Sequence, residues 1–227
     1  MRLCALALAL WPVLAGAEPI TAARYSEPTT RYDHGVLGDA VEWGALEMDV
    51  GGREITLRLP ETHVFEDIAP RLVTLPDGDV VVMTVETSIA QGARLALYDE
   101  NGVVAATPYI GQTNRWLAPI GAADLDGDGA IEVAYIDRPH LARILRVWRY
   151  ADGALTFVAQ TPGLTNHRIG ESDIGGGLRD CNGVIEMITA NADWTRVMAT
   201  RLVDGTLVSR DMGPHRGRAD LTAAQCC

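Results

Sequence analysis

Short runs of apolar residues separated by turn residues dominate the pattern of this chain. Four segments combine an apolar strand, a tight turn and a second strand, and they span residues 46–57, 95–104, 147–155 and 199–207. The glycines of their turns, Gly52, Gly102, Gly153 and Gly205, follow one another at intervals of 50, 51 and 52 residues. Three of them follow Asn or Asp, and such pairs favour hairpin turns because both residues tolerate a positive φ. The pattern predicts four regularly spaced β-hairpins.

A further apolar strand is expected before each hairpin. These strands cover residues 40–43, 80–85, 131–136 and 184–189. The apolar spacing of three and four residues that would indicate an amphipathic helix does not persist over a useful length. The sequence therefore predicts an all-β fold.

The regular spacing divides the chain into repeats of about 51 residues. After residues 1–17, a single domain is expected over 18–227, with repeats at about 36–62, 64–111, 113–163 and 165–213. Four such repeats predict a small β-propeller of about four blades, because radial repetition protects strand edges. A β-sandwich is the alternative. Residues 18–35 are less regular and could supply a strand that closes the ring against the last repeat.

An acidic loop in the third repeat is the most informative chemical feature. Its carboxylates and glycines alternate in the segment Asp124-Leu-Asp126-Gly-Asp128-Gly-Ala130-Ile-Glu132. Carboxylates packed this closely repel one another by several kcal/mol unless a cation lies between them. Oxygen ligands in a flexible loop suit Ca²⁺, so the expected ligands are Asp124, Asp126, Asp128, Glu132 and the backbone carbonyl of Ala130. A solvated Asp-Gly turn is the alternative.

The loop differs from an EF-hand. The twelfth position of an EF-hand loop needs a bidentate acid, and this chain has Tyr135 there. The following segment is β-branched and aromatic and predicts a strand rather than a helix. Residues 121–133 instead resemble the calcium-binding core of the FG-GAP/VCBS repeat, the blade unit of integrin-α-like β-propellers. The name-giving elements are not intact; the nearest matches are 117–119 and 120–121.

The resemblance implies a propeller blade and the same five calcium ligands. The chain also resembles the small exported VCBS-repeat proteins of proteobacteria. The corresponding loop of the next repeat retains Asp180, Asn182 and Glu186, while Leu178 replaces the first acid. One Ca²⁺ ion is therefore expected, and a second is not.

The amino-terminal residues predict export. Residues 1–17 combine Arg2, an apolar stretch and a small-residue cleavage site formed by Ala15 and Ala17. The apolar stretch is too short to span a membrane, and no later segment is long enough. The expected location is periplasmic or secreted. Cleavage leaves 18 basic against 30 acidic residues, a formal charge of −12, which argues against nucleic acid as a partner.

Three cysteines remain after the expected cleavage. In an oxidising compartment Cys181 is expected to pair with a tail cysteine, taken as Cys226. Pairing with Cys227, or a bridge between the two tail cysteines, stays open.

No motif for nucleophilic catalysis, zinc or nucleotide binding occurs. The most suggestive polar residues are those that equivalent propeller loops would gather on one face, namely Asn114, Arg115, Arg138, His140, Asn166, His167, Arg168 and Glu171. A histidine there could act as a general base while an arginine holds an anion. The alternative is that these side chains cap blade edges through backbone hydrogen bonds.

The sequence therefore favours an exported, non-catalytic, calcium-binding module that recognises a protein or glycan ligand. The first alternative is a periplasmic hydrolase or lyase that uses His140 or His167 with Arg138, Arg168 and Glu171. A scaffold in which calcium is purely structural is the second alternative.

Overall fold

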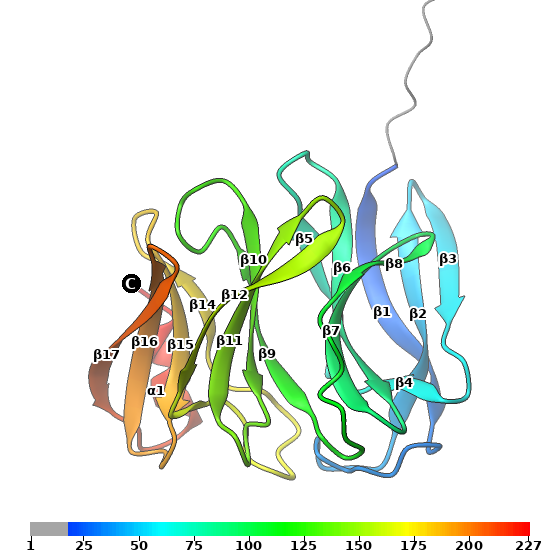
Figure 1. The fold of residues 1–227 in the computed structure, drawn as a ribbon. Helices are drawn as coiled ribbons and strands as arrows, with labels where there is room; N and C mark the ends of the chain where they lie inside the picture. Colours follow the sequence, from blue (N-terminus) through cyan, green and yellow to red (C-terminus); the bar gives the residue numbers. More distant parts are fainter. Residues whose placement is uncertain (1–17) are drawn as a thin grey trace, which may run out of the picture.

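The computed structural model describes residues 18–227, and this part of the chain is all-β. Seventeen strands form antiparallel sheets, and one short helix follows the last strand (Figure 1). The predicted signal peptide, residues 1–17, lies outside the described residues. Within residues 18–227 no helix is long and apolar enough to cross a bilayer.

The first sheet has eight strands in the order β1-β2-β4-β6-β7-β8, with β3 paired to β2 and β5 paired to β6. The strands are β1 (Ile20–Thr29), β2 (Glu42–Val50), β3 (Arg53–Arg58), β4 (His63–Phe65), β5 (Arg71–Thr74), β6 (Val80–Ser88), β7 (Gly92–Asp99) and β8 (Gly102–Ala106). The short strand β4 joins the two halves of this sheet, because it pairs with β2 on one side and β6 on the other.

The second sheet has four strands and the third has five. The second consists of β9 (Leu117–Ala123), β10 (Ile131–Asp137), β11 (Ile144–Ala151) and β12 (Ala154–Pro162). The third consists of β13 (Leu164–Thr165), β14 (Gly177–Asp180), β15 (Ile185–Asn191), β16 (Arg196–Val203) and β17 (Thr206–Pro214). Helix α1 (Arg218–Ala224) packs against β15 and β16.

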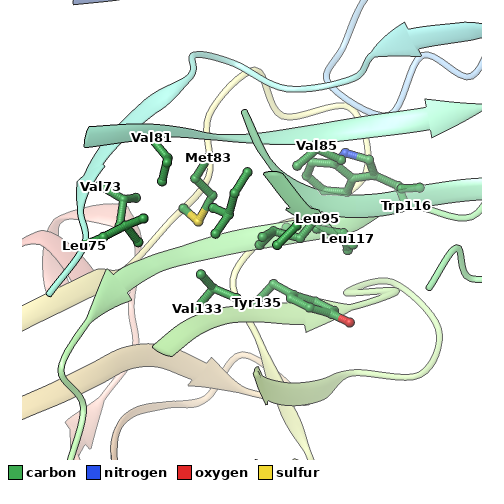
Figure 2. Packing of buried hydrophobic residues seen from close by; sticks show 14 of the residues in the cluster. Val73, Leu75, Val81, Met83, Val85, Leu95, Trp116, Leu117, Val133 and Tyr135 are labelled. Carbon is green, nitrogen blue, oxygen red and sulfur yellow. The ribbon is translucent and has the colours of Figure 1, made fainter. Parts of the chain in front are cut away.

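The sheets pack face to face, so successive residues of a central strand enter different cores. In β10, Val133 and Tyr135 belong to the cluster shared with the first sheet, whereas Ala134 and Ile136 belong to the cluster shared with the third. Figure 2 shows the first of these clusters, with Met83 and Leu95 on one side and Val133 and Tyr135 on the other. Alternation of side chains along a strand makes this arrangement possible. It also explains why four consecutive residues at the centre of β10, Val133–Ile136, carry apolar or aromatic side chains.

All four predicted hairpins form. They are β2–β3, β7–β8, β11–β12 and β16–β17. Asp152 and Gly153 both have positive φ, of 49° and 73°, as expected for a two-residue turn. The additional strands predicted at 80–85, 131–136 and 184–189 correspond to β6, β10 and β15. Residues 40–43 form no separate strand, because β2 begins at Glu42 and continues into its hairpin.

The last three repeats share a four-stranded antiparallel meander, formed by β5–β8, β9–β12 and β14–β17. The first repeat differs, since β4 connects it to the second repeat in one curled sheet. Antiparallel sheets packed in layers are compatible with both predicted architectures, the propeller and the sandwich.

The amino-terminal strand does not close a ring against the last repeat. β1 pairs with β2 along almost its whole length. Ile20 and Tyr25 of β1 are buried in the same cluster as Leu46 and Met48 of β2, and this burial fixes the pairing. The segment between β1 and β2 does reach the third sheet, where the amide of Gly170 donates to the carbonyl of Val36 (3.1 Å). That segment runs along the lower end of the molecule in Figure 1.

A disulfide ties the carboxyl terminus to the third sheet. Cys181 pairs with Cys227, with a Cα–Cα distance of 5.8 Å, and the exposed Cys226 is free. The expected pairing with Cys226 is therefore wrong. Helix α1 ends at Ala224, and Leu221 is buried against Ile188 in the last core cluster. The disulfide holds the segment that follows this helix.

Replacing Cys227 by Ser should lower the free energy of unfolding by about 2–4 kcal/mol, because the open chain gains conformational entropy when it unfolds. Urea denaturation measures the loss. Cys226→Ser is the matched control and should unfold like the wild type. Cys181→Ser should give the same loss as Cys227→Ser, and it removes the partner that Cys226 could take in Cys227→Ser. Equal stability of all three variants would contradict the assignment.

Candidate acidic metal loop and ligand pocket

The acidic loop connects β9 to β10, and its backbone is organised by one carboxylate. The two oxygens of Asp124 accept hydrogen bonds from the amides of Gly127 (2.7 Å), Asp128 (3.1 Å) and Gly129 (2.9 Å). Asp128 accepts another from the amide of Ala130 (2.9 Å). Oxygens of Asp124, Asp126 and Asp128 lie within 4.8 Å of one another. The local sequence therefore gathers three carboxylates, as predicted.

Glu132 does not belong to this group of three, and it is fully buried. Its carboxylate accepts hydrogen bonds from Arg149 Nε (2.5 Å) and from the amide of Leu125 (2.9 Å). Burial raises the pKa of Glu132, and these two donors oppose that change. The predicted fourth ligand is thus held by an arginine.

Arg149 is a residue of the candidate site that sequence reasoning missed. Its guanidinium also contacts Asp126 (2.6 Å) and Asp128 (2.9 Å). Arg149 lies directly opposite Glu132 in the register of β10 and β11. The register of this strand pair could therefore have indicated the contact. Four carboxylates against one guanidinium leave a formal charge of −3. A divalent cation bound by oxygen atoms would reduce this excess.

The corresponding loop of the third sheet differs in charge. Glu186 accepts hydrogen bonds from Arg179 (2.8 Å) and Arg210 (3.0 Å), and the Arg210 bond contributes most to lowering its pKa. Asp180 accepts from the amide of Gly183 (2.7 Å). Two arginines therefore balance the retained acid in this loop.

A pocket of about 240 Å³ lies at the other end of β10. This strand has seven residues, so the pocket and the acidic loop are separated by about 20 Å. The walls come from the segments that follow β1, β8, β10 and β13, and the lining residues are His34, Asn114, Arg115, Trp116, Arg138, Pro139, His140, Leu141 and Ile169. Four of the eight predicted binding residues are brought together here, namely Asn114, Arg115, Arg138 and His140.

Hydrogen bonds fix the tautomers of two histidines at this pocket. The carbonyl oxygen of Glu171 can only accept, so His167 donates to it through Nε2 (2.9 Å). In neutral His167 the other nitrogen, Nδ1, is then an acceptor for His140 Nε2 (2.9 Å). His140 Nδ1 consequently carries a lone pair, and no described residue donates to it. This pocket histidine is an acceptor.

Burial and neighbouring positive groups keep these histidines neutral. Burial, followed by His167, His34 and Arg143, lowers the pKa of His140 to about 4. Burial also lowers the pKa of His167. Both rings are therefore uncharged near pH 7.

His34 and Glu66 form a second polar pair that sequence reasoning missed. His34 Nδ1 contacts Glu66 Oε1 at 2.5 Å, and Thr87 donates to the other carboxylate oxygen (2.6 Å). Burial raises the pKa of Glu66, while His34 opposes the change. The Trp116 indole donates to the Glu66 carbonyl (2.8 Å). These contacts join residues far apart in the sequence, and no periodic pattern indicates them.

The other predicted residues do not line the pocket. Asn166 is fully buried and donates to the carbonyls of Ala118 (3.4 Å) and Pro119 (3.3 Å), which agrees with the predicted capping alternative. Arg168 lies over the ring of Trp194 at 4.5 Å. The Glu171 carboxylate pairs with Arg218 (2.6 Å). The Arg168 guanidinium and the Glu171 carboxylate therefore do not join the histidines, in contrast to the expected grouping.

No family model matches the chain, and no curated protein matches it. The residues of the loop and the pocket are therefore the basis for functional inference.

The neutral His140 predicts a stability that depends on pH. An unfolded histidine titrates near pH 6.5. Between about pH 6.5 and 4 the unfolded chain therefore binds a proton at this position that the folded protein does not, and stability falls as the pH falls. The wild type should lose on the order of 1 kcal/mol more than His140→Phe between pH 7.5 and 4.5, after allowance for solvent screening.

Urea denaturation at the two pH values measures this difference. Comparing wild type with variant cancels other titrating groups, such as Glu42, whose pKa burial raises to about 9. Equal losses in the two proteins would contradict a neutral, buried His140.

Proposed function

We propose that this chain is an exported, non-catalytic binding protein that carries a ligand in the pocket at one end and Ca²⁺ in the acidic loop at the other. The observation that carries the proposal is the convergence of four separate segments on one pocket. Ile169 and Leu141 at this pocket are 70% and 65% exposed, although both side chains are apolar. Exposed apolar side chains around a largely apolar hollow with a few polar groups are typical of binding sites.

The composition of the pocket favours binding over covalent catalysis. Its lining includes no serine, threonine, cysteine or carboxylate. Mechanisms that need a hydroxyl or thiol nucleophile or a pair of carboxylates therefore have no candidate residue there.

Calcium has an architectural role in this proposal. All carboxylates of the loop lie at the β9–β10 connection, about 20 Å from the pocket. The ion would neutralise most of the charge that Arg149 leaves unbalanced. The resemblance to the FG-GAP/VCBS repeat supports calcium over other divalent ions, and it supports treating each four-stranded meander as a propeller blade.

An exported location agrees with the cysteines. The Cys181–Cys227 pair supports an oxidising compartment, in which such disulfides persist. The expected signal peptide has the same implication.

Calcium should raise the melting temperature of the wild type, and Asp126→Asn should reduce that increase. Asp126 is the appropriate position because Asp124 is needed by three backbone amides of the loop. Asp152→Asn in the β11–β12 turn is the matched control, and it should respond to calcium like the wild type. Differential scanning calorimetry with calcium and with chelator measures both. A wild type that melts equally in both buffers would refute the calcium assignment.

Binding at the pocket is tested by substitutions of two exposed apolar residues. A fragment collection examined by ligand-observed NMR should yield compounds that bind the wild type and lose at least tenfold in affinity with Ile169→Asp. Val208→Asp is the matched control, because Val208 is 54% exposed on β17 and lies outside the pocket lining. Equal binding to both variants would contradict a ligand site here.

A hydrolase or lyase remains the second candidate, and one observation favours it. The free lone pair of His140 Nδ1 has the character of a general base. Turnover of any bound compound by the wild type, abolished in His140→Phe, would support this candidate over simple binding.

A further inference from the structure

The charge of the pocket contrasts with the charge of the protein. The chain has 30 acidic and 19 basic residues, yet the pocket lining contains two arginines and no acid. A cleft at the other end of the first sheet is lined instead by Glu18, Asp77, Asp79, Asp99 and Glu100. The pocket is therefore a local basic site on an acidic protein, and it disfavours cationic ligands.

Arg115 is the uncompensated charge of the pocket. Arg138 is paired with Asp137 through two hydrogen bonds (2.8 and 3.0 Å). Arg115 instead donates to the backbone carbonyl of Asn114 (2.8 Å), and within residues 18–227 it forms no ion pair with a carboxylate. The planar guanidinium has further donors in a geometry that matches a carboxylate.

His140 requires a hydrogen-bond donor from the ligand, whereas Arg115 requires an acceptor. Its Nδ1 lone pair accepts a hydrogen bond, because the relay through His167 to the Glu171 carbonyl uses the ring proton on Nε2. An anionic oxygen placed against this lone pair would be repelled. A ligand group that donates a proton satisfies it.

Apolar surfaces complete the site. The Trp116 ring lies stacked beside His140, with centroids 6.4 Å apart and an interplanar angle of 18°. The exposed Leu141 and Ile169 lie on the same pocket. A volume of about 240 Å³ is slightly below the range for drug-sized ligands, so a small molecule fits.

The walls are held in place before any ligand binds. Asn114 and Arg138 have φ values of 52° and 46°, and residues other than glycine seldom adopt this conformation unless their surroundings fix it. The Arg138 amide donates to the Trp116 carbonyl (3.0 Å). Gly92 allows the loop before β9 to approach, since a side chain there would meet the carbonyls of Gln112 and Arg115.

We propose that this pocket binds a small carboxylate that also carries an O–H or N–H donor and an apolar substituent. The carboxylate pairs with Arg115, the donor bonds to His140 Nδ1, and the apolar group lies against Trp116, Leu141 and Ile169. This inference rests on the proposed binding function and assigns the ligand class of the same site.

Mandelate has all three features and is a suitable probe. Phenylacetate lacks its hydroxyl, mandelamide lacks its charge, and 2-amino-1-phenylethanol has the opposite charge. Isothermal titration calorimetry should give a Kd for mandelate on the order of 1 mM, as expected for its size. Compared with mandelate, mandelamide should bind at least about tenfold more weakly and phenylacetate about threefold to tenfold more weakly. The amine should bind most weakly of the four.

Substitutions of Arg115 and His140 test which side chain contacts which group of the ligand. Arg115→Gln should weaken mandelate about tenfold and leave mandelamide nearly unchanged. Arg53→Gln, on the exposed surface of β3, is the matched control and should change neither. His140→Phe should abolish the preference for mandelate over phenylacetate. The comparison of ligands on the wild type needs no substitution at His140, so it stands even if that variant fails to fold.

The outcomes separate this inference from the proposed function. Binding of mandelamide or the amine as tightly as mandelate would overturn the ligand class, as would equal effects of Arg115→Gln and Arg53→Gln. If no member of the series binds while other fragments remain sensitive to Ile169→Asp, only the ligand class fails. If no compound binds in a manner sensitive to Ile169→Asp, both proposals fail.

Discussion

The central constraint on this structure is that its inner sheets have two apolar faces. In β6, Met83 and Val85 contribute to one core while Val82 contributes to another. A meander built from such strands cannot be stable alone, because either face would expose apolar surface to water. Each meander therefore needs cover on both faces, and in the first sheet the strands β1 and β2 provide it for β6 and β7. At the end of the series, helix α1 covers the last sheet, with Leu221 buried in the final cluster.

Face-to-face packing places the acidic loop and the pocket at the two ends of the strands. One end carries the β9–β10 connection with its carboxylates, and the other carries the connections that form the pocket. Strand β10 contacts both sites. This largely buried strand separates the two sites by about 20 Å.

The corresponding loops of the second and third sheets differ in both their acids and their arginines. In the second sheet one guanidinium, that of Arg149, forms ion pairs with three carboxylates, and an excess of negative charge remains. In the third sheet Arg179 and Arg210 both serve Glu186. The balance of charge, more than the spacing of acids, distinguishes a loop that favours a cation from one already neutralised.

The sequence by itself determined the all-β class, the strands β6, β10 and β15, the four hairpins and the grouping of Asp124, Asp126 and Asp128, because turn preferences and alternation act over a few residues. The sheet partner of β1, the pairing of Cys181 with Cys227 and the place of His34 beside Glu66 were decided by tertiary structure. Of the eight predicted binding residues, the fold placed Asn114, Arg115, Arg138 and His140 on the pocket and buried Asn166 in a structural role. Such contacts join residues dozens of positions apart, and their energies depend on how whole sheets pack, which no local pattern encodes.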